Sequence, residues 1–253
     1  QTMIYFVSFN RHQEDGLIEA SNMRRSTLAA RLNSRLNKFF KVGFSSNFGV
    51  QDYSQNSQWA DNSQIYAANP LVAAKMALPY DAPYYYSFDE DGNLVKGDRA
   101  AGLLYSQFLL PWFTVANTNQ DRKNVTLNLS LNEQFTPVEG LTFTALQSMF
   151  GYDLTSDRAS LPYDQFTTPM GQVIDAHTGG VSANFSRYYA YTLTHTAEFR
   201  HNFGPHYVNL LLGEETRIQK GRGFGITSTG QTDVRRMLLN TATTITPSAQ
   251  TDS

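Results

Sequence analysis

Residues 124–135, "NVTLNLSLNEQF", alternate between apolar and polar side chains along most of their length. Val125, Leu127, Leu129 and Leu131 share one parity, and asparagine, threonine and serine residues occupy the other. Successive side chains of an extended chain point to opposite faces. This segment is therefore predicted to be a β-strand with one apolar face and one uncharged polar face.

A similar alternation recurs along the chain and predicts seven strands. They are residues 2–10, 25–36, 40–50, 122–135, 141–150, 187–200 and 207–217. The first and the fifth fit less well than the others. Ile4 and Phe6 in the first, and Leu146 and Phe150 in the fifth, fall on the parity that is otherwise polar.

The links between these segments are alternately long and short. "NKF", "TPVEG" and "HNFGPH" form the short links, whereas the long links are about 11–24, 51–120, 151–186 and everything after about 218. A compact soluble domain rarely contains a structureless loop of more than about 15 residues. Outer-membrane barrels combine tight turns at one end with long loops at the other. We therefore expect the three short links to lie together at one end of the sheet.

These patterns predict an all-β fold, an antiparallel up-and-down meander that is part of a large transmembrane β-barrel with long extracellular loops. Residues 1–253 are expected to form one partial barrel domain. The polar face would line a water-filled or plugged lumen, and the apolar face would contact lipid. The predicted lipid-facing side chains are Leu28, Leu32, Val42, Phe44, Val125, Leu127, Leu129, Leu131, Leu193 and Leu210.

Composition narrows the possible function classes. The net charge of −2 and the pI near 6.2 argue against a nucleic-acid-binding protein, which would carry a basic surface. The absence of cysteine excludes disulfides, thiolate metal sites and cysteine nucleophiles. No apolar run approaches the ~18 residues of a membrane helix. Because the chain opens within a strand pattern and shows no signal peptide, we expect it to be part of a longer protein.

Four stretches of the chain, taken in order, resemble a known family. They are "YFVSFNRHQEDGLIEASNMRRSTLAARLNSRLNKFFKVGFSSNFG", "LPYDAPYYYSFDEDGNLVKG", "NEQFTPVEGLTFTALQSMFGYD" and "TLTHTAEFRHNFGPHYVNLLLGEET". Their succession resembles the SusC/RagA-type TonB-linked transporters of Bacteroidetes outer membranes. Together the stretches extend over nearly the whole chain.

The resemblance implies a function and a set of partners. Members of this family have an N-terminal plug inside a 22-stranded barrel, and they import oligosaccharides or peptides with TonB and the proton-motive force. Neither a plug nor a TonB-interacting segment is apparent in this sequence, so the resemblance implies an early-to-middle portion of the barrel wall in the bacterial outer membrane. The implied partners are a SusD-like surface lipoprotein, TonB through the plug region, outer-membrane lipid and a glycan or peptide substrate. No nucleic-acid partner is expected.

Two groups of side chains are candidates for binding. Amphipathic aromatic side chains are common anchors of interfaces, and several of them gather in the longest link. The candidate ligand- or partner-binding residues there are Tyr80, Tyr84, Tyr85, Tyr86 and Phe88. The alternative is that such a long link packs a small core of its own. On the polar parity, Arg25, Arg31 and Arg35 can bind an anionic substrate or pair with carboxylates of a plug or of neighbouring strands.

Residues 87–98 place Asp89, Asp91, Gly92 and Asp98 at offsets that are similar to a calcium-binding EF-hand loop. The segment begins with serine and no helical periodicity flanks it, so a tight hairpin turn at Asp91-Gly92 is the preferred interpretation. The five histidines show no metal-ligand spacing. We predict neither a metal site nor a cofactor.

The sequence carries no nucleophile elbow, no metalloprotease motif and no Ser/His/Asp arrangement, so an enzyme is not expected. Two other function classes stay open. A soluble or surface-attached β-sandwich that binds carbohydrate predicts strand faces packed on a second sheet and loops of similar length at both ends. A β-rich glycan-degrading enzyme needs two carboxylates that converge in a cleft.

Overall fold

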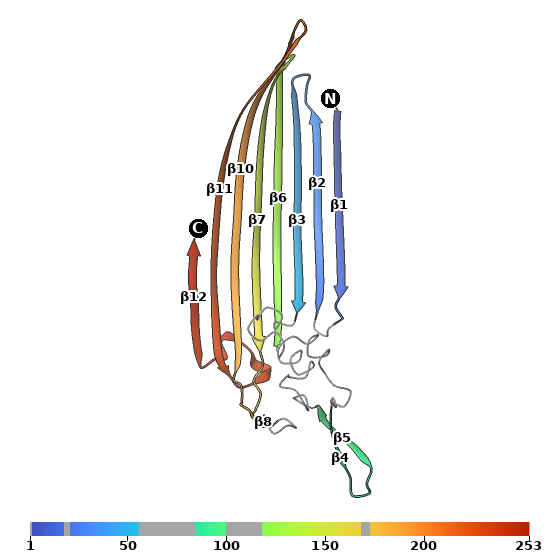
Figure 1. Cartoon of the computed structure of the whole chain (residues 1–253), viewed down its shortest axis with the longest axis vertical. Helices are drawn as coiled ribbons and strands as arrows, with labels where there is room; N and C mark the ends of the chain where they lie inside the picture. Colours follow the sequence, from blue (N-terminus) through green and yellow to red (C-terminus); the bar gives the residue numbers. More distant parts are fainter. Residues whose placement is uncertain (1, 18–20, 56–83, 100–117, 168–172, 253) are drawn as a thin grey trace.

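The computed structural model describes residues 2–17, 21–55, 84–99, 118–167 and 173–252. Its main feature is an antiparallel sheet of eight strands in the order β1-β2-β3-β6-β7-β10-β11-β12 (Figure 1). These strands are β1 (Thr2–Asp15), β2 (Asn22–Arg35), β3 (Phe40–Gln55), β6 (Thr118–Val138), β7 (Leu141–Ser160), β10 (Gly179–Phe203), β11 (His206–Gln231) and β12 (Thr244–Asp252). The all-β antiparallel meander is confirmed, because neighbours in the sheet follow one another along the chain.

Smaller elements lie in the links between the long strands. A separate hairpin is formed by β4 (Tyr84–Phe88) and β5 (Leu94–Arg99), and a two-residue pair by β8 (Phe166–Thr167) and β9 (Val173–Ile174). The link between β11 and β12 contains two 3₁₀ turns, η3 (Val234–Arg236) and η4 (Leu239–Thr241). None of the described segments forms a helix of the length and hydropathy that crossing a membrane requires.

The two ends of the sheet differ in their connections. The β2–β3, β6–β7 and β10–β11 turns all lie at the upper end in Figure 1, which we call the short-turn end. The other connections leave from the opposite, long-link end. Gln55 and Thr118, which flank the longest link, are therefore at the other end of the sheet from the "TPVEG" turn. The predicted placement of the three short links at one end, opposite the longest link, is confirmed.

The strands are longer than the hydrophobic pattern predicted, from 14 residues in β1 to 26 in β11. The expected long link at 11–24 is wrong, because β1 continues to Asp15 and β2 begins at Asn22. Strands β7 and β10 likewise extend into both ends of the expected link 151–186. The chain after 218 completes β11 and adds an eighth strand, β12, which the pattern did not predict.

The extra strand length has a physical cause. Toward the long-link end, charged residues such as Arg11 and Asp153 occupy the parity that is apolar in the middle of the same strand. The hydrophobic alternation therefore stops while backbone pairing continues. In β11, Gly221, Gly223 and Gly225 lack side chains altogether, so no alternation is visible although the residues are paired with β10.

Strand register defines two faces, because directly paired residues of antiparallel strands carry their side chains on the same face. Leu129, for example, is paired with Ser46 on one side and with Met149 on the other. Following such pairs across the sheet brings all ten side chains predicted to face lipid onto one face, which we call the apolar face. The opposite, polar face carries Asn128 and Ser130, and also the four misfit residues of the first and fifth predicted segments.

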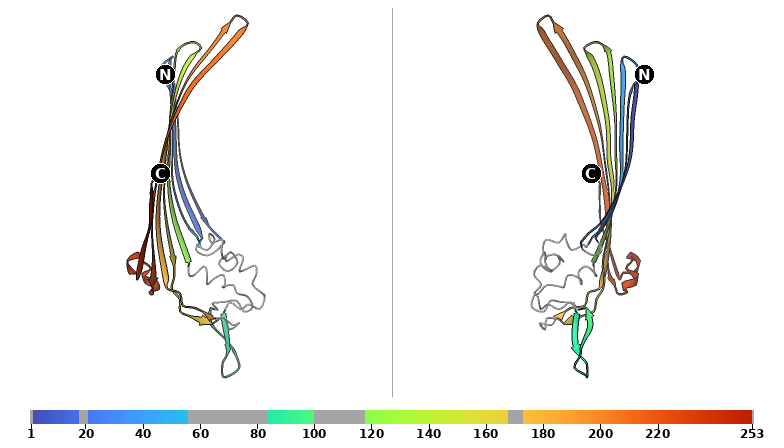
Figure 2. Two further views of the ribbon diagram at one scale, coloured as in Figure 1. Left: turned by 60° about the vertical axis from the view of Figure 1, so that its left-hand side comes forward. Right: turned by 90° about the vertical axis from the view of Figure 1, so that its right-hand side faces the viewer.

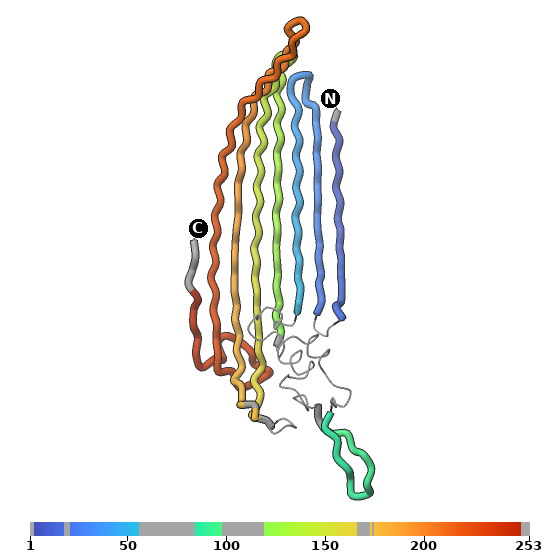
Figure 3. The backbone as a smooth tube through the Cα atoms, in the orientation of Figure 1, coloured from blue at the N-terminus to red at the C-terminus, as the bar shows by residue number. Residues whose placement is uncertain are grey.

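No second layer of described residues covers either face. Ala190, with 6% of its surface exposed, is the buried hydrophobic side chain of the described chain, whereas Phe9 and Leu212 are 68% and 76% exposed. Figure 2 shows the sheet from two sides as a thin, twisted and curved layer. A β-sandwich would bury one face against another sheet, so the described residues do not form that alternative fold. In Figure 3 the β10–β11 hairpin extends furthest at the short-turn end.

Gly140 closes the β6–β7 turn in the left-handed region, with φ at +86°. Its carbonyl oxygen accepts a hydrogen bond from the Arg200 N–H at 2.7 Å, and a Cβ atom at this position would collide with the Arg200 carbonyl oxygen. Gly204 in the β10–β11 turn also has a positive φ, +64°, but a Cβ atom there would meet nothing within 4 Å. The β6–β7 turn thus requires glycine because of both the positive φ and the close approach of Arg200, whereas the β10–β11 turn requires it because of the positive φ alone.

Gly140→Ala is therefore expected to destabilise the folded protein by about 1–3 kcal/mol, because strain and a backbone clash add. Gly204→Ala provides the matched control, with strain alone and a smaller loss. The measurement is the urea midpoint of the complete protein that carries this chain. Equal urea midpoints for the two variants would mean that the clash of the added Cβ atom with the Arg200 carbonyl oxygen does not destabilise the protein.

Candidate functional site

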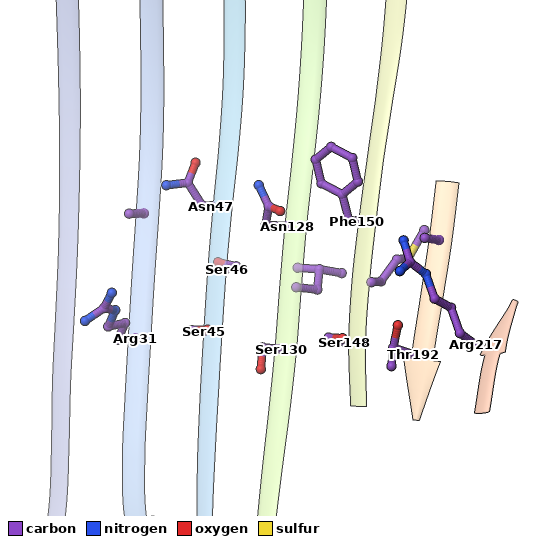
Figure 4. A pocket seen from close by; sticks show the side chains of 14 residues that line it. Arg31, Ser45, Ser46, Asn47, Asn128, Ser130, Ser148, Phe150, Thr192 and Arg217 are labelled. Atoms are coloured by element: carbon purple, nitrogen blue, oxygen red, sulfur yellow. The ribbon is translucent and has the colours of Figure 1, made fainter. Parts of the chain in front are cut away.

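A groove of about 460 Å³ lies over the middle of the sheet, and residues of six neighbouring strands line it (Figure 4). Most of the lining belongs to the polar face. These polar-face residues are Ala29, Arg31, Ser45, Asn47, Asn128, Ser130, Ser148, Phe150, Ala190, Thr192 and Arg217. The groove is therefore a feature of the face that was predicted to line a lumen.

One row of paired residues crosses this groove from β2 to β11. In order, the row is Arg31, Ser45, Ser130, Ser148, Thr192 and Arg217. We call these six residues the hydroxyl row, because four hydroxyl groups lie side by side between two guanidinium groups (Figure 4). Adjacent strands are about 4.8 Å apart, so the two arginines are separated by roughly 24 Å along the sheet. Asn47, Asn128 and Phe150 lie in the adjacent row (Figure 4).

The chemistry of the groove is that of a neutral hydrogen-bonding surface with two positive ends. Each hydroxyl group offers one donor and two acceptor lone pairs, and each amide side chain offers both functions. The lining contains no aspartate, glutamate or histidine, so the pair of carboxylates that a glycoside hydrolase needs is absent from this groove. A long polar molecule, such as an extended peptide or an oligosaccharide, would find hydrogen-bonding partners along the whole row.

The three arginines predicted on the polar face are all found there, but they lie apart. Arg31 lines the groove, whereas Arg35 lines a second groove of about 360 Å³ nearer the short-turn end, together with Lys41. Arg25 lies toward the long-link end, in the row of Gln51. Among the described residues, none of the three arginines forms an ion pair. Pairing with carboxylates of neighbouring strands is therefore not observed within this sheet.

The predicted aromatic candidates lie on the β4–β5 hairpin, apart from Tyr80, which is outside the described residues. This hairpin is at the long-link end of the molecule (Figure 1), away from the groove. The Lys96 ammonium group lies 3.5 Å from the centre of the Tyr84 ring, so Tyr84 contributes to the structure of the hairpin itself. Tyr86 and Phe88 are exposed, Phe88 to 74%. Their role in binding stays a prediction.

Asp89 organises the tip of this hairpin. Its Oδ1 accepts hydrogen bonds from the N–H groups of Asp91, at 3.0 Å, and Asn93, at 2.7 Å. Gly92 completes the turn with φ at +80°. The segment that is similar to an EF-hand loop thus forms a tight turn. Within the described ranges no three residues of the His, Cys, Asp or Glu type are grouped so that they can hold a metal ion.

The turn at Asp89 is expected to depend on pH. The backbone hydrogen bond from Asn93, followed by that from the Asn93 side chain, lowers the pKa of Asp89 below its ordinary value. The carboxylate therefore stabilises the turn fully above the ordinary aspartate pKa, and this contribution is lost as pH falls through the lowered pKa. We expect the Asn93 amide to lose protection from hydrogen exchange over that pH range, after correction for the intrinsic rate. Asp89→Asn, whose oxygen does not titrate, should remove the pH dependence. If it persists in this variant, Asp89 is not its source.

Comparisons with known proteins give a structural match. No family model matches the chain, and no curated protein matches it. The chain is similar to the structure of the RagAB peptide transporter, with a TM-score of 0.75 over 100% of this chain, 27% of that chain and 20% identity.

Two further solved structures, of the RagAB peptide importer, are also similar to the chain. The "closed-closed" state has a TM-score of 0.67 over 100% of this chain, and the "open-open" state one of 0.72 over 99%. Both are 19% identical, and in both this chain spans 27% of the matched chain. At this level of identity the likeness concerns the fold. The sheet described here therefore shares its fold with part of a chain in the RagAB transporter.

Proposed function

We propose that this chain is a wall segment of an outer-membrane transporter barrel of the SusC/RagA type, which imports peptides or oligosaccharides. The observation that carries the proposal is the division of one uncovered sheet into a continuous apolar face and a polar face with a groove. The fold shared with the RagAB peptide transporter supports the same assignment. A sheet of this kind is stable when the apolar face contacts lipid and the polar face lines the lumen.

The height of the apolar face suits a bilayer. On β6 the apolar side chains of Leu127, Leu129 and Leu131 lie between two charged positions. One is the row of Val125, which contains Asp153 and Arg187, and the other is Glu133, eight residues further along the strand. These eight residue steps span about 27 Å along the strand, or roughly 20 Å of height at the usual tilt. The apolar band of outer-membrane barrels is about 25 Å tall.

Aromatic side chains lie just beyond this band at the short-turn end. Phe135 has its ring centre 6.4 Å from that of Phe40 and 6.5 Å from that of Phe143, across three neighbouring strands. Girdles of aromatic residues mark the membrane interfaces of outer-membrane barrels. The three phenylalanines therefore support a membrane boundary at this level, with the short turns on the periplasmic side.

The proposed partners follow from the complete transporter. In the proposal a SusD-like surface lipoprotein meets the long links on the outer side, and TonB acts through a plug domain elsewhere in the protein. The groove on the polar face would contact either the passing substrate or the plug. Its uncharged floor and two terminal arginines favour a long polar substrate such as a peptide.

Fluorescence quenching tests the proposed function directly. A fluorophore placed at position 127, 129 or 131 of the complete protein should be quenched by a nitroxide that is restricted to lipid. The same fluorophore at position 128 or 130 should not be quenched, because these side chains face the lumen. Equal quenching at both parities, or none at either, would refute the assignment of the apolar face to lipid.

The exposed tyrosines of the β4–β5 hairpin test the proposed contact with substrate or lipoprotein. Tyr85→Ala together with Tyr86→Ala is expected to lower uptake while leaving the barrel assembled, because both side chains are exposed. Tyr84→Ala is the control, since its ring packs against Lys96 and its loss should first increase cleavage of the hairpin by protease. Normal uptake in the double variant, with normal surface levels, would exclude a binding role for this pair.

A further inference from the structure

Lysine and arginine side chains on the apolar face are concentrated at one of its two ends. We call them the cationic border, and its members are Arg11, Arg24, Lys123, Arg187, Lys220 and Arg222. All six are exposed. The inference drawn from this border rests on the proposed function, because it requires the apolar face to contact a membrane.

Strand register brings the six cations into three successive rows. Arg11, Arg187 and Arg222 lie in the row of Val125, on β1, β10 and β11. Arg24 and Lys123 belong to the next row toward the long-link end. Lys220 lies in the row of Leu127, where the apolar band begins. The border therefore follows the long-link edge of the apolar band across the sheet.

Most of these charges have no partner within the described sheet. The Arg187 guanidinium binds the Asp153 carboxylate at 2.6 Å. Arg11, Arg24, Lys123 and Lys220 form no ion pair with a described side chain, whereas Arg222 is paired in register with Asp252, whose side chain is not among those described. Asp52 and Asp252 are the other carboxylates in the same rows, Asp252 being opposite Arg222 on β12, and Asp15, Asp121 and Asp157 follow one row further from the apolar band. Positive charge thus prevails directly at the edge of the band.

The short-turn end of the same face is different. From the row of Leu129 to the short turns, the described strands carry no lysine or arginine on the apolar face. The charged groups there are Glu133 and Glu214, the latter 3.0 Å from the His195 ring. The two borders of the apolar band therefore differ in the sign of their charge.

We infer that the cationic border binds phosphorylated lipid headgroups in the leaflet at the long-link end. Arginine and lysine at a membrane surface keep their stems in the apolar layer while their charged ends reach the headgroups. Hydrogen bonds between these cations and phosphate are strengthened by charge. The opposite border offers no such donors, so the two leaflets would be recognised differently. A zwitterionic headgroup would not explain a net positive border on one side only.

The test uses the complete protein reconstituted in phosphatidylcholine vesicles that contain a small fraction of spin-labelled lipid. Spin-labelled phosphatidic acid supplies the phosphate monoester, and spin-labelled phosphatidylcholine supplies the neutral comparison. Wild-type protein should be enriched in phosphatidic acid among its contacting lipids. The triple variant Arg11→Gln, Lys123→Gln, Arg222→Gln should lose about fivefold or more of this preference, since one basic residue near a charged surface contributes about that factor.

A matched variant distinguishes the effect of the cationic border from the effect of the protein's net charge. Arg25→Gln, Arg35→Gln, Lys41→Gln removes three cations from the polar face, so its preference for phosphatidic acid should stay at the wild-type level. An equal loss in both triple variants, or no preference in the wild type, overturns the inference. If the border variant assembles poorly, the wild type in high salt replaces it, and preference that survives screening also overturns the inference. Quenching at position 129, measured in the same vesicles, reports separately on the proposed function.

Discussion

Leu129→Arg is expected to remove most of the assembled protein from the outer membrane. Leu129 lies in the middle of the apolar band, paired with Ser46 and Met149 on the neighbouring strands. An arginine on the lipid face near the midplane costs about 2–4 kcal/mol, which is a large part of the stability of a folded protein. Asn128→Arg changes the adjacent residue on the polar face, where the guanidinium stays hydrated. Assembly should then be close to normal, although passage through the barrel can change.

The measurement is the amount of heat-modifiable barrel in outer-membrane fractions, for both variants expressed at matched levels. A soluble sheet would also be harmed by Leu129→Arg, so intolerance alone does not establish a lipid contact. The two variants are therefore interpreted together with the quenching experiment in reconstituted bilayers, which measures for each position whether its side chain contacts lipid. Normal assembly of Leu129→Arg, or equal defects in both variants, would contradict the assignment of faces.

Reversing the charge at both ends of the hydroxyl row is expected to reverse the preference of the transporter for charged substrates. In Arg31→Glu, Arg217→Glu, two attractive sites for an anionic group become repulsive. One contact between unit charges at 4 Å in water contributes about 1 kcal/mol. A change from attraction to repulsion thus amounts to about 2 kcal/mol, or roughly thirtyfold, for an acidic peptide, and to the same amount in the opposite sense for a basic peptide. The ratio of acidic to basic peptides taken up is therefore expected to fall by about 4 kcal/mol, or roughly a thousandfold.

Paired uptake assays with acidic and basic peptides of equal length measure this ratio. Arg25→Glu serves as the control, because Arg25 is on the polar face but does not line the groove. If the arginines hold the plug, the double variant should instead make the barrel leaky to large antibiotics while the uptake ratio stays constant. An unchanged ratio would therefore exclude a role of the hydroxyl row in substrate selection.

The middle of β2, β3, β6 and β10 was predictable because one face is apolar there and the other is not. Leu127, Leu129 and Leu131 illustrate this, since their parity alone identified the face on which the structure has them. The outer parts of the strands were not predictable, because the alternation ends where charged residues occupy both faces. The eighth strand, β12, follows two 3₁₀ turns and pairs with a glycine-rich part of β11.

The groove depends on register, which sequence supplies only across short turns. Ser130 and Ser148 flank the β6–β7 turn, and their pairing follows closely from its length. Ser45 is joined to Ser130 across the longest link, and Thr192 to Ser148 across another long one. A loop of that length fixes no register. Arg31 was therefore predicted only as one of three arginines on the polar parity, with Arg25 and Arg35, and its place at one end of a row of hydroxyl groups was not predicted.

The order of the strands has a consequence for how this sheet comes together. Every strand pairs with the strand that precedes it in the meander, so six of the eight strands form three tight hairpins in series, β2–β3, β6–β7 and β10–β11, with β1 and β12 at the two edges. A β-hairpin forms within about 1–10 μs. The link between β3 and β6 is about five doublings of length longer than a tight turn, so the loop-closure entropy of bringing its ends together costs about 3 kcal/mol more. The three hairpins should accordingly form first, and the pairing of β3 with β6 and of β7 with β10 should form last. Until these strands pair, β3, β6, β7 and β10 each expose an unpaired edge. An assembly factor that protects the incomplete sheet would therefore bind at these four strands.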